Sequence, residues 1–260
     1  MAKISKAMGT SDRSESLGER LLAADRHELV VLLEQNATEL DVEASLLALR
    51  NPFLDGHGLG VLLEQRRLLG SYRLRRELAS HRLVPEARAL QFLATLYWRD
   101  LVEIQRDTRV SPRLRRAAEK HLAARLPGLG LGERIALARR AAGSLLEELG
   151  GERTPRVIAA LLENPRCTEG MVVRLAGRTS TNAEVLRVVA RARRWSSRIE
   201  VRRALCLNPL APAAVVLPLL PTLPKVHLRR VARLDGVDPA VRRRACVLLG
   251  EDPAGADRSA

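Results

Sequence analysis

Apolar residues recur three and four positions apart along most of the chain, and short polar or proline-containing breaks separate these stretches. Such spacing puts apolar side chains on one helix face. The β-branched and aromatic runs typical of strands are missing, so the pattern predicts an all-α protein. The predicted helices span residues 17–35, 41–50, 57–68, 71–80, 86–97, 99–107, 112–125, 132–148, 155–163, 169–177, 182–194, 197–206, 212–220, 225–234 and 239–249.

Two short motifs recur along the chain and indicate internal repeats. The first pairs Leu74 with Pro85, Leu101 with Pro112 and Leu228 with Pro239, each eleven residues apart, and a looser copy that starts at Leu186 has Ser197 in place of the proline. The second is Asn-Pro, at residues 51–52, 164–165 and 208–209. Self-similarity of this kind is typical of stacked supersecondary units.

The motifs predict where helices begin and end. In Ser111-Pro112, Thr154-Pro155 and Asp238-Pro239, a side-chain oxygen is expected to cap the helix while proline takes the first helical position. Proline bars the preceding residue from the α region, so each Asn-Pro is expected at a helix C-terminus. Apolar positions also agree between copies: eight residues after each asparagine stand Leu59, Val172 and Val216, and eleven residues after it stand Leu62, Leu175 and Leu219. These positions are expected to be buried.

The repeats predict an α-solenoid of stacked antiparallel helix pairs, short and right-handed, with a division into two half-solenoids near residues 126–155. Residues 16–126 and 155–250 would be the N-terminal and C-terminal repeats, and residues 127–154 a linking helix. Residues 1–15 and 251–260 are rich in Ser, Gly, Asp and Ala and are expected to be disordered tails.

The order Asn-Pro, then Leu-Arg-x-Val-Ala-Arg, then Val-x-Pro-x-Val-Arg-Arg resembles bacterial helical-repeat proteins of the HEAT and leucine-rich-repeat-variant type, and is closest to a group from high-GC bacteria. The resemblance covers roughly residues 40–125 and 155–250. It implies a stack of helices and says almost nothing about function. Some leucine-rich-repeat-variant proteins hold an iron–sulfur cluster on clustered cysteines. Here Cys167, Cys206 and Cys246 lie 39 and 40 residues apart, so no cofactor is expected.

Composition narrows the class of protein. Hydrophobic residues make up 46% of the chain and aromatics 2%, which indicates a core of Leu, Val and Ala. The formal charge is +14, of which residues 151–260 supply +10 with 20 basic and 10 acidic residues. That excess has two explanations, well-solvated helix faces or an anionic partner.

Three features of the sequence bear on the location of the protein. An odd number of widely spaced cysteines favours a reducing, cytoplasmic compartment. Residues 1–16 contain no apolar stretch, so no signal peptide is expected. Residues 207–224 carry no charge but contain five prolines, which argues against a membrane span.

The sequence contains no recognisable catalytic motif. The glycine-rich runs at residues 56–60 and 128–132 follow no predicted strand, the five histidines are scattered, and no nucleophile–base arrangement occurs. No metal site is expected, and the chain is predicted not to be an enzyme.

Arginines carry the one functional signal. Seven of them, with Trp195 beside them, are predicted to form an arginine ridge on one surface, because Arg187 and Arg191 align with Arg229 and Arg233 in the next copy. The predicted ridge consists of Arg187, Arg191, Arg194, Arg198, Arg202, Arg229 and Arg233. Equally, long arginines could simply cover a solvated face.

Three functions are compatible with these features. The first is a scaffold that binds another protein or peptide on its repeat surface. The second is a nucleic-acid-binding module that uses the basic C-terminal half. The third is a HEAT-like DNA glycosylase, which would need two of Trp98, Trp195, Tyr72 and Tyr97 around a buried carboxylate in a concave pocket.

Overall fold

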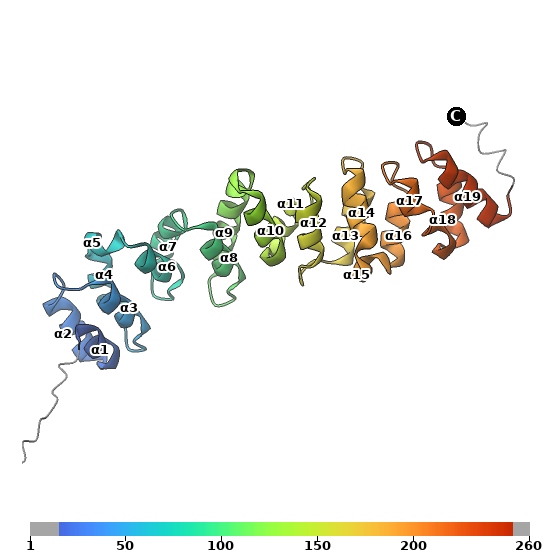
Figure 1. Cartoon of the computed structure of the whole chain (residues 1–260). Coiled ribbons are helices and arrows are strands. Elements are labelled where there is room, and N and C mark those ends of the chain that lie inside the picture. Colours follow the sequence, from blue (N-terminus) through green and yellow to red (C-terminus); the bar gives the residue numbers. More distant parts are fainter. Residues whose placement is uncertain (1–15, 252–260) are drawn as a thin grey trace, which may run out of the picture. The chain divides into compact units, whose positions relative to one another are not determined.

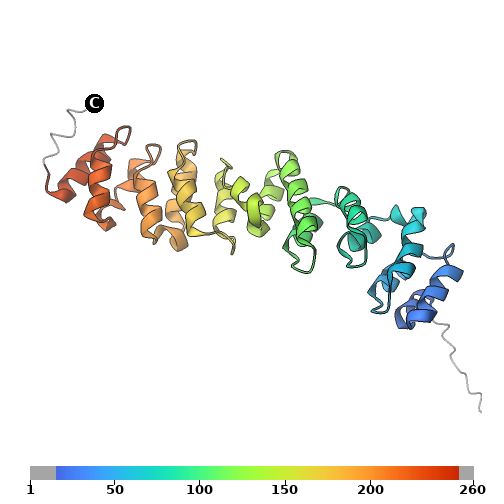
Figure 2. The same ribbon diagram turned by 180° about the vertical axis from the view of Figure 1, so that it is seen from behind.

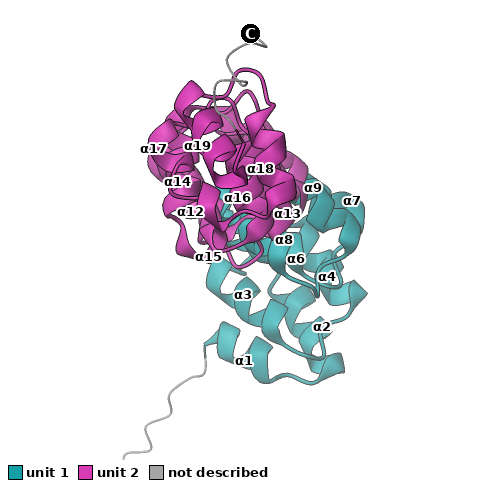
Figure 3. Cartoon of the chain, turned by 90° about the vertical axis from the view of Figure 1, so that its right-hand side faces the viewer, with its two compact units in different colours: residues 1–118 teal, residues 119–260 magenta. Residues whose placement is uncertain are grey.

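The computed structural model describes residues 16–251 and divides the chain into two compact units, residues 1–118 and 119–260 (Figure 3). Within the described range every regular element is a helix, which confirms the all-α prediction. The predicted tails lie outside the described residues, except for Glu251.

In the first unit, helices pack on near neighbours in the chain. Its α1 contacts α3, α2 contacts α4, and α6 contacts both α3 and α7 (Figure 1). Its helices are α1 (Leu17–Ala23), α2 (Arg26–Gln35), α3 (Val42–Arg50), α4 (Gly56–Glu64), α5 (Arg66–Leu69), α6 (Tyr72–Ser80), α7 (Glu86–Leu93), α8 (Trp98–Arg106) and the start of α9 (Pro112–Arg125).

The second unit follows the same rule. Two views from opposite sides show its helices side by side in chain order (Figures 1 and 2). Its α12 contacts α10 and α14, α13 contacts α16, and α18 contacts α19. After the end of α9 come η1 (Leu126–Gly128), α10 (Leu131–Arg140), α11 (Gly143–Leu149), α12 (Pro155–Leu162), α13 (Glu169–Gly177), α14 (Ala183–Arg191), α15 (Arg193–Ser196), α16 (Ile199–Cys206), α17 (Ala213–Val216), η2 (Leu220–Thr222), α18 (Lys225–Ala232) and α19 (Pro239–Leu249).

Several helices are shorter than the apolar pattern predicts. The predicted helices 17–35, 57–68, 132–148 and 182–194 are each split in two. At the first break, the Asp25 side chain accepts hydrogen bonds from the amides of His27 and Glu28 and so begins α2. The apolar periodicity continues across such a break, so the periodicity alone does not reveal where the helix is interrupted.

The segment expected as one linking helix, residues 127–154, forms α10 and α11 instead. Gly143 separates them with a φ of 58°, in the left-handed region that favours glycine. The Glu119 carboxylate accepts hydrogen bonds from Ser144 Oγ and the Leu145 amide at 2.8 and 2.9 Å. A Cβ on residue 143 would lie 2.5 Å from a Glu119 carboxylate oxygen, so a side chain there would disturb this bonding as well as strain the backbone.

The core consists mainly of Leu, Val and Ala, and the repeat positions are buried as predicted, with one exception. Leu62 and Leu175 are buried, but Leu219 is only half-buried and Leu220 is fully buried in its place. The expectation for Leu219 was therefore wrong. Pro218 and Pro221 cannot donate to a helical ladder, so α17 lasts one turn and the tighter η2 moves the inward position by one residue.

Each Asn-Pro motif lies at a helix end, as predicted, and its asparagine also joins two parts of the fold. Asn51, Asn164 and Asn208 are 3%, 1% and 2% exposed. Asn164 Nδ2 donates to the carbonyls of Ala138 and Ala141 at 2.8 and 3.0 Å, at the end of α10. Its Oδ1 accepts from the Arg166 amide at 2.8 Å.

The other two copies repeat this bonding. Asn51 Nδ2 donates to carbonyls at the end of α1, and Asn208 Nδ2 donates to carbonyls at the end of α13. Each Oδ1 accepts from the amide two residues on. The asparagine therefore stops one helix and satisfies the last carbonyls of an earlier one.

Replacing Asn164 with Ala should lower the free energy of unfolding by about 2–4 kcal/mol, because buried carbonyls lose their donor. Asn182→Ala is a matched control, since Asn182 is exposed and makes one cap bond and one bond to the Arg153 carbonyl. It should cost about 1 kcal/mol. Urea denaturation measures both, and equal losses would contradict the role given to the buried asparagine.

Leu220→Ala should cost about 2–5 kcal/mol, as expected for a buried leucine, whereas Leu219→Ala should cost about 1 kcal/mol or less. Chemical denaturation of the two single variants compares neighbouring residues of identical chemistry. A larger loss for Leu219 would mean that the inward position lies where the repeat pattern first placed it.

Candidate interaction surface

The predicted arginine ridge does not follow one helix. Arg187 and Arg191 lie on α14, but that helix ends at Arg191 and the backbone of Ala192 is extended. Arg194 belongs to α15. The predicted stripe of Arg187, Arg191 and Arg194 was therefore wrong for its last member.

Three of the ridge arginines form ion pairs or hydrogen bonds with neighbouring groups. Arg187 forms an ion pair with Glu184 within α14. Arg198 Nε lies 3.9 Å from a Glu169 carboxylate oxygen. Arg202 Nη2 donates to the Ser197 carbonyl at 2.8 Å. These guanidinium groups are held by the protein's own atoms.

The remaining members are exposed. Leu186 and Val189 on α14 are buried, as are Leu228 and Val231 on α18, in agreement with the alignment of the two copies. Arg187 and Arg229, which follow these two leucines, therefore occupy equivalent positions on their helices. Of all ion pairs described between residues 16 and 251, none involves Arg191, Arg229 or Arg233.

The prediction that Trp195 lies on the surface beside the arginines was wrong. The residue is only 4% exposed. Its Nε1 donates to the Leu162 carbonyl at 2.9 Å, two residues before Asn164. Arg194 lies over the indole, with its Cζ 4.4 Å from the ring centroid, a cation–π contact. In the first unit, His81 Nε2 lies 3.2 Å from the Leu49 carbonyl, two residues before Asn51.

A groove of about 510 Å³ opens where α12, α14 and α15 meet. We call it the Trp195 groove. Its apolar lining comes from Ala159, Leu162, Val188, Ala192 and Trp195, and its charged lining from Glu163, Arg191, Arg193 and Arg194. Glu163 already faces Arg139, whose Nε lies 3.3 Å from its Oε2. Because Arg194 lies over the Trp195 ring, Arg191 and Arg193 are the arginines that remain beside the apolar floor.

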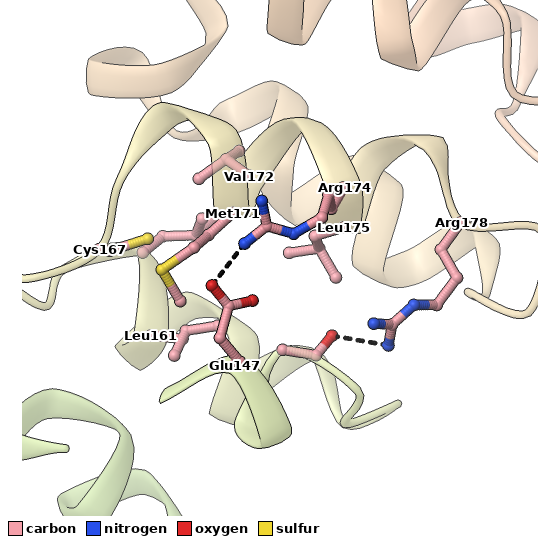
Figure 4. Close-up of a pocket in the computed structure, with 10 residues that line it drawn as sticks. Glu147, Leu161, Cys167, Met171, Val172, Arg174, Leu175 and Arg178 are labelled. Carbon is pink, nitrogen blue, oxygen red and sulfur yellow. Dashed lines mark hydrogen bonds and ion pairs between the residues drawn. The ribbon is translucent and has the colours of Figure 1, made fainter. Parts of the chain in front are cut away.

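A second, smaller pocket lies between α11, α12 and α13 (Figure 4). At about 20 Å³ it has room for a single water. Figure 4 shows Glu147 and Arg174 pointing toward each other, and they form an ion pair. Arg178 Nη1 donates to the Gly150 carbonyl at 3.1 Å. These contacts join neighbouring helices, so we assign this pocket a packing role.

The cysteines are free and buried. Burial raises the pKa of Cys167 to about 11 and that of Cys206 to about 12, so both stay protonated near neutral pH. No cluster of three or more His, Cys, Asp or Glu side chains placed to hold a metal ion lies in the described part of the chain.

Two of the aromatics considered for a glycosylase meet around a carboxylate in the first unit. The ring centroids of Tyr72 and Tyr97 are 4.6 Å apart, and the Tyr72 hydroxyl donates to Asp100. Arg76 Nη1 lies 3.9 Å from the same carboxylate, which is 22% exposed. Protein groups thus occupy both Asp100 and the facing ring surfaces.

Comparison with protein-family models, curated proteins and solved structures finds no match to this chain. None of the helices between residues 16 and 251 combines the length and apolar character needed to cross a membrane. The candidate site therefore rests on the groove's own geometry.

Sequence reasoning missed several groove residues. Arg193 was passed over because the predicted helix ran through it, although it lies on α15. Val188, Ala159 and Leu162 read as ordinary core positions. Only the break at Ala192 turns α15 toward α12 and opens the groove between them. Nothing in the sequence around Ala192 indicates that its backbone is extended.

Thiol reagents should label Cys167 and Cys206 slowly in the folded protein near neutral pH, because the thiolate is the reactive form and burial disfavours it. Labelling with a chromogenic disulfide, with and without denaturant, measures this. Fast reaction of either thiol in the folded state would contradict the burial described here.

Proposed function

We propose that this protein is a non-enzymatic helical-repeat scaffold that holds an acidic segment of another protein in the Trp195 groove. Each unit is a short α-solenoid of the HEAT or leucine-rich-repeat-variant type in this proposal. Its support is the packing of successive helices on near neighbours and the repeated asparagine bonding. The free, buried cysteines favour a cytoplasmic location.

The groove is the observation that carries the proposal. An apolar floor gains free energy when it removes an apolar side chain from water. Trp195 is fixed by its bond to the Leu162 carbonyl, so the floor is preorganised and loses little entropy on binding. A partner should therefore present one apolar side chain at this point.

The rim determines the charge of the partner. Arg191 and Arg193 are exposed, and neither belongs to any ion pair found among the described residues. Guanidinium groups bind carboxylates in a bidentate geometry. The partner segment should carry acidic residues on either side of its apolar anchor. A phosphate backbone would use the rim and leave the apolar floor empty, which is why a peptide is favoured here.

Labelled peptides with one Leu between Glu residues should bind the intact protein in fluorescence anisotropy. Replacing the Glu residues with Gln, or the Leu with Ser, should each weaken binding by about tenfold, or about 1.4 kcal/mol. Val188→Asp should abolish binding, because it puts a negative charge in the groove.

Val226→Asp is the matched control, because Val226 is 64% exposed on α18 and does not line the groove. It should bind the peptide like the wild type. Equal affinity for the Ser-substituted peptide, or equal loss in both Val→Asp variants, would rule out the groove as the binding site.

A further inference from the structure

The second unit carries a separate basic surface on α18. Lys225, Arg229 and Arg230 on α18 and Arg233 at its C-terminal cap are all exposed, and we call them the α18 face. Arg229 and Arg233 lie four positions apart, about one helical turn or 6 Å along the axis. None of the four belongs to an ion pair found among residues 16–251.

Few acidic residues stand near this charge in the sequence, and none precedes it in the segment that contains it. Residues 201–234 contain six basic residues and no acidic one. Of the acids that follow, Asp235 is exposed and belongs to no ion pair found among residues 16–251, and the Oδ1 of Asp238 accepts from the Ala240 amide at 2.8 Å at the start of α19. Because charges in water are screened within about 10 Å at ordinary salt, distant acidic residues compensate little of it.

The helices before α18 differ in this respect. Glu184 pairs with Arg187 on α14, and Arg203 Nη2 lies 2.6 Å from Glu200 Oε2 on α16. Arg198 faces Glu169. Of the predicted ridge arginines, Arg187 and Arg198 are thus compensated by carboxylates, whereas Arg229 and Arg233 are not among the described ion pairs.

From this we infer that the α18 face binds the phosphate backbone of nucleic acid, without reading its sequence. Apart from Val226, the exposed positions of α18 are cationic, whereas a protein interface needs an apolar centre. Interfaces with nucleic acid are more polar and far more positively charged. Arginine binds phosphate in a bidentate geometry, and contacts to phosphate carry no base specificity.

The test uses a labelled DNA duplex of mixed sequence and the full chain in fluorescence anisotropy. Three phosphate contacts predict that affinity falls about 40-fold between about 50 and about 200 mM salt. R229Q/R230Q/R233Q should weaken binding at least about tenfold and lower the slope of log affinity against log salt by about 2–3.

The control variant R187Q/R198Q/R203Q removes the same three charges from positions that are ion-paired. It should weaken DNA binding by less than about threefold. Equal weakening in the two variants would show that net charge, not the α18 face, drives binding. No DNA binding, or equally tight binding of a poly-Glu peptide to the same face, would also overturn the inference.

Arg191→Gln with Arg193→Gln separates this inference from the proposed function. That double variant should lose the acidic peptide and keep the DNA. Loss of both ligands together would mean that the groove and the α18 face form one binding surface, which would overturn the assignment of nucleic acid to α18.

Discussion

Short helices impose one constraint on which the rest of the structure depends: each leaves its last carbonyls without partners. Here every described helix has fourteen residues or fewer, and carbonyls at the ends of α1, α10 and α13 are buried. Asn51, Asn164 and Asn208 meet this need by donating to carbonyls at the ends of earlier helices. Since an unsatisfied buried carbonyl costs about 1–3 kcal/mol, these asparagines tie successive layers together.

The same constraint builds the candidate site. The carbonyl two residues before the asparagine accepts from Trp195 in the second unit, and in the first unit it faces the ring nitrogen of His81. Trp195 is therefore buried because a helix end needs a donor, and its ring becomes the floor of a groove. Packing requirements and a binding surface thus arise from one contact.

Much of the fold could be predicted from local pattern. The all-α class, the helix ends at Asn-Pro and the burial of Leu62 and Leu175 follow from proline geometry and helical spacing. Capping was predicted less evenly: Ser111 Oγ accepts from the Leu114 amide, but the Thr154 side chain caps nothing. The prediction for Leu219 failed because Pro218 and Pro221 replace an α-turn by a 3₁₀ turn, which shifts the register by one residue.

By itself, the sequence determined which residues are apolar, where prolines end helices and how much positive charge the C-terminal half carries. Tertiary structure decided which of those charges are free. Glu169 lies 29 residues before Arg198 in sequence, yet the fold brings it within 3.9 Å, while the arginines of α18 meet no carboxylate among the described ion pairs. Pairing of charges depends on distances in space, which a linear pattern does not fix.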